Sequence, residues 1–227
     1  MKVAAIIPAF NEEKTVGEVV KIISQSSIVD EIIVISDGST DASAQKAREA
    51  GANVVHELPW RHGKGSAMSH GVTHTDAPIL LFLDADLIGL TKKHIEDIVQ
   101  PVLEGKRAMN VGLRERGFFW TKLAWYLPLI GGERAMQRQV FENIPGRYLS
   151  GFKAEGALNY YCRANHLPYG KVILRGIKIV RKMEKFGFWV GLWEYIKMGW
   201  QIIWAITEVR LARQVFTTKG AHEKHQH

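Results

Sequence analysis

The stretch PILLFLDADL, residues 78–87, decides the fold, because five consecutive apolar residues end abruptly in two carboxylates. A short run that is apolar at every position is typical of a strand buried on both faces, as in a parallel sheet covered by helices. Asp84 and Asp86 follow directly, separated only by Ala85. Two like charges this close repel each other, so we expect a counter-charge or a ligand beside them.

Apolar runs alternate with segments of helical spacing through the first hundred residues. Strands are predicted over 2–8, 31–36, 53–57 and 78–83, and helices over 11–25, 40–52 and 64–75. For the second helix, Ser39 or Thr40 is the expected N-cap. Further along, residues 152–167 predict a helix and residues 170–180 a strand. This order predicts an α/β fold, with a Rossmann-like, mostly parallel sheet flanked by helices.

The chain of 227 residues is long enough for one main domain, which we expect to span residues 1–180. Residues 181–216 predict a C-terminal amphipathic helix, and residues 217–227 a disordered tail. Cys162 is the single cysteine, which excludes an internal disulfide and fits a reducing compartment. The N-terminal segment becomes acidic too early for a signal peptide, so a cytoplasmic location is expected.

Three of the predicted strands end in polar segments, at residues 8–12, 37–41 and 84–86. The carboxyl ends of parallel strands meet at one edge of a sheet, where the ligands of open α/β folds bind. Asp84 and Asp86 lie two positions apart, so both can point to one site, and their oxygens suit Mg²⁺ or Mn²⁺. The alternatives are a cap for a helix that begins near Thr91 and a plain exit to solvent.

Two further residues at this edge have candidate roles. Asp37 could accept the N–H of a nucleobase, or it could serve only the tight turn that an Asp-Gly pair makes. Lys64 lies between two glycines at a predicted helix N-terminus, which suits a phosphate or the acceptor side of a site. The glycine patterns typical of P-loops and of dinucleotide-binding folds are absent from the sequence.

The segments IIPAFNEE, IIVISDGSTD, GKGSAMSHG and LFLDADL together resemble the inverting glycosyltransferases of family 2, which have the GT-A fold. The resemblance covers about residues 1–115, and the chain is most similar to the dolichol- and polyprenyl-phosphate sugar synthase branch. It implies a nucleotide-diphosphate sugar as donor, with UDP-sugar favoured over GDP-sugar, and Mg²⁺ or Mn²⁺ as cofactor. One departure is Ile88, where these synthases often carry a polar residue.

The resemblance also implies roles for single residues. Asp86 would bind the metal that bridges the diphosphate and would be catalytic, while Asp84 would face the ribose or sugar beside that metal. Ile35 and Asp37 would read the base. The full set of expected donor-binding residues is Pro8, Ala9, Phe10, Glu12, Ile35, Asp37, Lys64, Asp84, Ala85 and Asp86.

The acceptor side depends on three other residues. Glu155 is the best candidate for a general base if the acceptor is a hydroxyl, although the Glu-Asp pair often found in the family is incomplete there. If the acceptor is a phosphate, Glu155 would hold sugar hydroxyls instead, or it would only stabilise a helix N-terminus. Arg134 and Arg138 lie four apart, which predicts one helical face that either clamps an acceptor phosphate or faces solvent.

The last quarter of the chain carries its whole excess of charge. The net charge is +7, and residues 171–227 hold 11 basic and 4 acidic residues. Tryptophan at helical spacing with flanking basic residues is typical of a helix in the lipid headgroups, and residues 118–130 predict a second contact. We therefore expect a protein peripheral on the inner face of the membrane, without a nucleic-acid partner. The alternative is that this helix packs on the domain or in a homo-oligomer. The aromatic residues at helical spacing are Phe186, Trp189, Trp193, Trp200 and Trp204.

Three functions remain open from the sequence. The first is sugar transfer to a membrane polyprenyl phosphate, and the second is transfer to a soluble acceptor such as a phosphorylated small molecule. The third is non-catalytic binding of a nucleotide sugar, which the intact pair of aspartates disfavours. The identity of the sugar and the stereochemical outcome are open as well.

Overall fold

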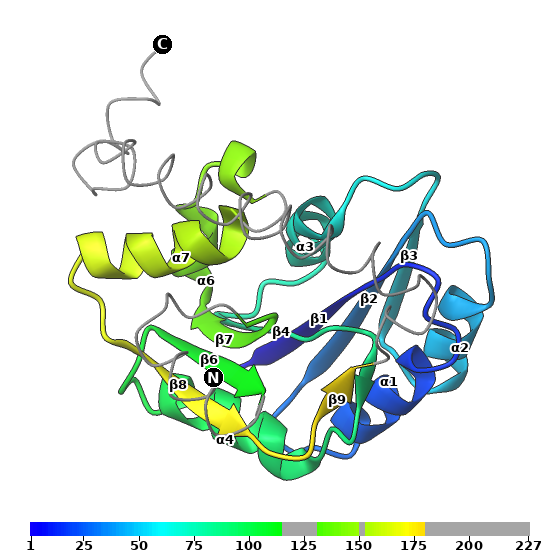
Figure 1. The fold of residues 1–227 in the computed structure, drawn as a ribbon, viewed down its shortest axis with the longest axis horizontal. Helices are drawn as coiled ribbons and strands as arrows, with labels where there is room; N and C mark the ends of the chain where they lie inside the picture. The colour runs from blue at the N-terminus through cyan, green and yellow to red at the C-terminus, as the bar shows by residue number, and fades with distance from the viewer. Residues whose placement is uncertain (115–130, 150–152, 180–227) are drawn as a thin grey trace, which may run out of the picture.

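A computed structural model of the chain describes residues 1–114, 131–149 and 153–179. These residues form a seven-stranded sheet between two layers of helices, together with a separate two-stranded sheet (Figure 1). The elements in chain order are β1 (Val3–Ala9), α1 (Val16–Ser24), β2 (Glu31–Asp37), α2 (Ser43–Glu49), β3 (Val54–Leu58), α3 (Lys64–Val72), β4 (Ile79–Phe82), β5 (Leu87–Ile88), α4 (Lys92–Leu103), β6 (Met109–Arg114), β7 (Glu133–Gln137), α6 (Arg138–Glu142), the 3₁₀ helix η1 (Gly146–Tyr148), α7 (Lys153–Ala164), β8 (Tyr169–Leu174) and β9 (Lys178–Ile179).

The main sheet has the strand order β3-β2-β1-β4-β7-β6-β8. Strands β1 to β4 are parallel to one another, β7 runs antiparallel to both β4 and β6, and β8 is parallel to β6. The predicted α/β fold with a mostly parallel sheet is therefore confirmed. Because β7 alone is reversed, the carboxyl ends of β4 and β6 and the amino end of β7 meet at the same edge.

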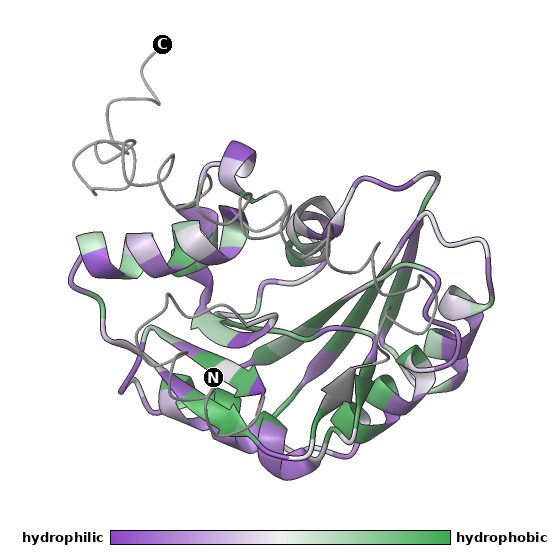
Figure 2. Ribbon diagram, viewed as in Figure 1, coloured by the Kyte–Doolittle hydropathy of each residue, from purple (hydrophilic) through white to green (hydrophobic). Residues whose placement is uncertain are grey.

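Both faces of the sheet are covered, which explains why its strands are apolar at successive positions. In β1 the side chains of Val3 and Ala5 join the core with α1, α2 and α4, whereas Ala4 and Ile6 join the core with α3, α6 and α7. All four are 0% exposed. Figure 2 shows the apolar colour along the strands and the polar colour on the outer sides of the helices. The polar residues that end the strands consequently lie at the rim, outside the two cores.

Two elements differ from the sequence prediction near this rim. The helix expected over 40–52 begins only at Ser43, with Ala42 as its N-cap, so the prediction that Ser39 or Thr40 caps it is wrong. Those two residues hold the first loop instead: the Ser39 hydroxyl accepts the Asn11 N–H at 3.1 Å, and the Thr40 N–H donates to Asn11 Oδ1 at 2.9 Å. The single strand expected over 170–180 is divided into β8 and β9, and β9 pairs with β5 just after Asp86.

Several predictions lie outside the described residues. They are the amphipathic helix over 181–216, the tail over 217–227 and the membrane contact over 118–130. Within the described part of the chain, no helix combines the length and the apolar character needed to cross a membrane.

Candidate active site

Asp84 and Asp86 lie just beyond the end of β4, at the carboxyl edge of the sheet. Both are half-buried, whereas Ala85 between them is 3% exposed and packs in the core beneath α1 and α4. This alternation turns the two carboxylates to the same side, as the spacing predicted.

The two aspartates differ in their partners. The Asp84 carboxylate binds the ammonium of Lys64, the first residue of α3, and lies 3.5 Å from Arg114 Nη2 at the end of β6. Among the residues that the structure describes, Asp86 has no ion-pair partner. Asp84 is therefore held in place by cations, and the Asp86 carboxylate is left for a ligand.

The backbone approaches Asp84 closely at Gly132. A Cβ at this position would lie 2.5 Å from Asp84 Oδ2 and 2.9 Å from Lys64 Nζ, which is closer than real Cβ atoms come. Glycine lets the chain that enters β7 pass beside the ion pair. It thereby brings Glu133, the first residue of β7, into the group that we call the Asp84 cluster: Lys64, Asp84, Arg114 and Glu133.

Charges within the Asp84 cluster set its protonation. Burial alone would raise the pKa of the Asp84 carboxyl, but Lys64 and Arg114 lower it below its ordinary value. Burial alone would lower the pKa of Lys64, but Asp84 raises it. Burial, and then the charge of Asp84, raise the pKa of Asp86. The ion pair therefore stays charged near neutral pH, and Asp86 is a carboxylate whose charge is opposed by its surroundings.

A divalent cation fits this arrangement. The Asp86 carboxylate has no ion-pair partner in the described structure. The Asp84 carboxylate lies beside it and points to the same side. A cation at Asp86 would remove the repulsion that raises its pKa. Oxygen ligands of this kind suit Mg²⁺ or Mn²⁺. Ile88 lies in β5 with 45% of its surface exposed and offers no ligand atom.

Asp37 lies at the end of β2 and is 3% exposed. Its two carboxylate oxygens accept the backbone N–H groups of His62 at 2.7 Å and Gly63 at 2.8 Å. Next to it, Gly38 has φ of +70°, and a Cβ there would lie 2.5 Å from the backbone nitrogen of Arg61. Asp37 thus fixes the loop that leads into α3 and so places Lys64. Its expected role in reading a base remains a prediction.

The residues expected around the base and ribose are only partly accessible. Ala9 and Ile35 are 2% and 0% exposed and belong to the two cores, so their side chains do not face a ligand. Pro8, Phe10 and Glu12 are half-buried at the end of β1. The guanidinium of Arg61 lies 4.2 Å above the Phe10 ring, so the loop before α3 also covers the end of β1.

The prediction that Arg134 and Arg138 share one helical face is wrong, whereas their role in binding an acceptor remains a prediction. Arg134 lies inside β7, which pairs with β4 and β6, and α6 begins only at Arg138. Arg138 donates to the carbonyls of Thr75 at 2.6 Å and Val72 at 3.2 Å, so it binds the end of α3. The structure does bring Arg134 to Glu155: the Arg134 side chain is 2% exposed, and its Nη2 lies 4.0 Å from Glu155 Oε2.

Sequence analysis missed Arg114, Gly132 and Glu133. Arg114 ends β6 in the direction of β4, so the rule that gathers polar strand ends at one edge would have found it once β6 was recognised. Glu133 is different, because it starts an antiparallel strand and reaches the edge by its amino end. That placement follows only from the reversed direction of β7.

Glu133 carries a prediction about pH. Its carboxyl is 0% exposed, and burial and then Asp84 raise its pKa from 4.5 to about 7, against the opposing effects of Arg114 and Lys64. Between pH 4.5 and 7 the native state therefore binds more protons than the unfolded state, and wild-type stability falls as pH rises. Glu133→Gln has no carboxyl at this position, so its stability does not fall in the same way. The free energy of unfolding of Glu133→Gln minus that of wild type should therefore increase by up to about 3 kcal/mol as pH rises across this window. Urea unfolding of both metal-free proteins from pH 5 to 8 tests this, and a difference that does not change with pH would contradict it.

Comparison with known proteins agrees with this geometry. The family model described as Glycosyl transferase family 2 matches residues 4–153. Glucosyl-3-phosphoglycerate synthase of Mycolicibacterium paratuberculosis is 31% identical over 180 residues, which is 63% of this chain and 55% of that protein. 4,4'-Diaponeurosporenoate glycosyltransferase of Staphylococcus aureus is 39% identical over 109 residues, 46% of this chain and 29% of that protein. The chain spans about half of the first relative and less of the second.

Solved structures show the same fold over more of the chain. The crystal structure of glucosyl-3-phosphoglycerate synthase from Mycobacterium tuberculosis in complex with Mn²⁺, UDP-glucose and phosphoglyceric acid has a TM-score of 0.74 at 26% identity, covering 92% of this chain and 79% of that one. A complex of the same enzyme with Mg²⁺ and UDP also has a TM-score of 0.74. These comparisons support the GT-A fold and do not single out the polyprenyl-phosphate branch. Because the family model matches about two thirds of this chain, the chain belongs to glycosyltransferase family 2.

Proposed function

We propose that this protein transfers a sugar from a UDP-sugar to a small soluble acceptor that carries an anionic group, with Mg²⁺ or Mn²⁺ as cofactor. The observation that carries the proposal is the Asp86 carboxylate, which has no ion-pair partner among the described residues, beside the fixed Lys64–Asp84 ion pair at the sheet edge. The M. tuberculosis relative of similar fold was solved with Mn²⁺, UDP-glucose and phosphoglyceric acid, which supports the same classes of cofactor, donor and acceptor.

On the donor side, each residue has a distinct task. Asp86 would hold the metal together with the diphosphate, and when bound the metal stabilises the charge that develops on the leaving diphosphate. Asp84, kept ionised by Lys64 and Arg114, would accept hydrogen bonds from the ribose or sugar. Asp37 would act one step away, because it holds the loop that positions Lys64.

On the acceptor side, Glu155 and Arg134 are the candidates. Glu155 lies in the first turn of α7 with 20% of its side chain exposed. Its Oε2 is buried toward Arg134, without a hydrogen-bond partner within the described structure. A glutamate carboxylate beside the acceptor can take the proton of an attacking hydroxyl. Arg134 would fix the orientation of Glu155 from beneath.

The relatives favour an acceptor that carries a carboxylate, and the first of them favours a soluble one. Both curated relatives are named for compounds that carry a carboxylate, phosphoglycerate and 4,4'-diaponeurosporenoate. The first acts by name on a soluble phosphorylated acid. Transfer to polyprenyl phosphate, and the peripheral membrane location expected from the C-terminal sequence, remain predictions.

An acceptor panel tests the proposal. Purified protein with Mn²⁺ would be offered UDP- and GDP-sugars and three acceptors: 3-phosphoglycerate, glycerol 3-phosphate and a short-chain polyprenyl phosphate in detergent. We expect metal-dependent release of UDP and a glycosylated phosphorylated acid, detected by mass spectrometry. Transfer to the lipid alone would contradict the choice of acceptor. Nucleotide binding without turnover on any of them would indicate a non-catalytic binding protein.

A further inference from the structure

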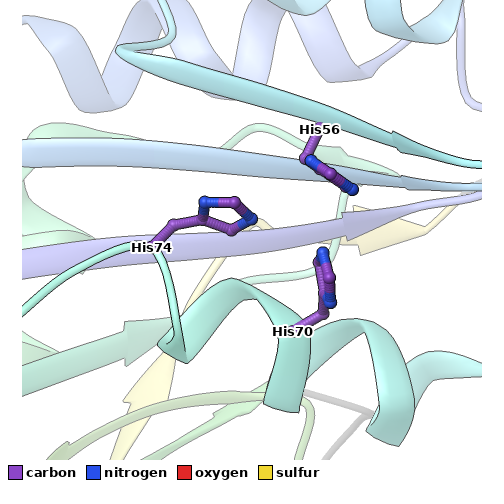
Figure 3. A group of neighbouring side chains, drawn as sticks. All are labelled: His56, His70 and His74. Atoms are coloured by element: carbon purple, nitrogen blue, oxygen red, sulfur yellow. The ribbon is translucent and has the colours of Figure 1, made fainter.

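Three histidines gather near the end of α3, whereas Lys64 is its first residue, and the proposed function does not use them. His56 lies in β3, His70 in the last turn of α3, and His74 two residues beyond that helix (Figure 3). One potential ligand nitrogen from each lies within 4.8 Å of the others. Among the described residues, this is the group of metal-ligating side chains that meets such a distance limit.

The fold explains how these residues meet. His70 and His74 are four apart, so they lie on the same side of the chain as α3 ends. Helix α3 packs across β1 and β2, and β3 is the edge strand next to β2, where His56 is in register with Ile35. The ring centroids are separated by 4.5 Å for His56–His70, 5.0 Å for His56–His74 and 5.2 Å for His70–His74.

Two ring nitrogens of this group lack hydrogen-bond partners among the described residues. All three residues are half-buried. The Nε2 atoms of both His70 and His74 are buried without a hydrogen-bond partner in the described structure. Leaving a buried polar atom unsatisfied costs roughly 1–3 kcal/mol.

We propose that His56, His70 and His74 bind one transition-metal ion, with Zn²⁺ as the best match, and that this site is separate from the metal at Asp86. Neutral imidazoles suit Zn²⁺, whereas carboxylates suit Mg²⁺ and Mn²⁺, so the two sites differ in metal preference. Zinc–nitrogen bonds of about 2.0–2.1 Å place ligand nitrogens roughly 3.3 Å apart in a tetrahedral site. Small rotations of the rings toward one another achieve this, and a water or small anion completes the fourth position.

Such a site would tie together the two ends of the loop before α3. His56 precedes this loop and His70 follows it, while Asp37 holds the loop through His62 and Gly63. A bound ion would therefore link β3 to the last turn of α3, at the end of the helix away from Lys64. Because it binds the native state, it also raises the free energy of unfolding in proportion to the logarithm of the metal concentration above Kd.

The experiment uses the full chain in a background that removes competing ligands. His222, His225 and His227 in the tail are replaced by glutamine, and metal is stripped with a chelator. Titration with Co²⁺ should then give a visible absorption band of a nitrogen-ligated site that saturates at one equivalent, and Zn²⁺ should abolish this band and raise Tm. Failure of the background protein to bind one equivalent of Co²⁺ or Zn²⁺ would overturn the proposal.

Matched variants locate the site. His74→Gln and His70→Gln/His74→Gln should lower Zn²⁺ affinity by more than the about 10–100-fold seen when a group that only supports a metal ligand is lost. His94→Gln, at a half-buried histidine on α4, should bind zinc like the background protein. Asp86→Asn should also keep the zinc site. A failure of the zinc proposal can therefore be told apart from a failure of the proposed glycosyltransferase function. Unchanged zinc affinity in a folded His74→Gln protein, with folding checked by circular dichroism, would contradict the assignment.

Discussion

Asp86→Asn is expected to lower kcat for sugar transfer by at least about 10³-fold, while the protein remains as stable as wild type or becomes more stable. The substitution keeps the shape of the side chain and removes the charge that would hold the metal, whose stabilisation of a transition state amounts to several kcal/mol. Stability should not suffer, because burial and Asp84 already oppose the charge of Asp86. Initial rates at saturating Mn²⁺ and thermal unfolding of the metal-free protein give the two quantities.

A matched control comes from the other end of the same strand. Asp76 lies exposed before β4, at the edge opposite Asp86, so Asp76→Asn changes the net charge equally without touching the site. Its kcat should stay within about twofold of wild type, in keeping with the small effects of surface substitutions. If Asp86→Asn retained wild-type kcat, the assigned metal ligand would be wrong.

Asp84→Ala is expected to have a different result, a lower free energy of unfolding by about 2 kcal/mol at pH 7. Removing this carboxylate leaves the Lys64 ammonium without its hydrogen-bond acceptor and Arg114 without one of its two carboxylate neighbours. Breaking a fully buried ion pair costs about 3–5 kcal/mol, and the smaller figure reflects the 44% exposure of the Lys64 side chain. Although that side chain is partly exposed, its ammonium donates a hydrogen bond to Asp84.

The dependence on pH follows from the lowered pKa of Asp84. Its contribution to stability is complete above the pKa of an unfolded aspartate, about 3.9, and is lost as pH falls through the lower native pKa. Urea unfolding of wild type and Asp84→Ala should thus differ most at pH 7 and converge in acid. The double variant Lys64→Met/Asp84→Ala should recover part of the loss, since it removes the orphaned cation as well. Equal stability of Asp84→Ala and wild type at pH 7 would show that the ion pair contributes nothing.

The parallel half of the fold and the orientation of the aspartate pair could be predicted from local pattern. The run at residues 79–83 is apolar at every position because both of its faces are buried, and the two-residue spacing alone turns Asp84 and Asp86 to one side. These features depend on the spacing of apolar and polar residues along a strand, which can be read from the sequence.

The antiparallel part could not be predicted in this way. The segment around Arg134 and Arg138 has helical spacing, yet Glu133–Gln137 is a strand, because pairing with both β4 and β6 outweighs local preference. The contacts of Arg134 with Glu155 and of Glu133 with Arg114 follow from that pairing.

The predicted N-cap of the second helix was wrong because polar side chains can also form hydrogen bonds between loops. Ser39 and Thr40 have the side chains of helix caps, but the same hydrogen-bonding groups serve equally well between loops, and here they bind Asn11. The histidine group shows a related difficulty. The spacing of His70 and His74 is visible in the sequence, but the third member, His56, joins them only through the packing of α3 beside the edge of the sheet.

Calorimetric titration of UDP, with and without Mn²⁺, into wild type and Asp86→Asn tests most directly whether Asp86 binds the metal. Wild-type protein should bind UDP more tightly when Mn²⁺ is present, and Asp86→Asn should bind it with the same weak affinity in both conditions while keeping its Tm. An Asp86→Asn protein whose UDP affinity still rises with Mn²⁺ as in wild type would contradict the assignment of Asp86 as the metal ligand.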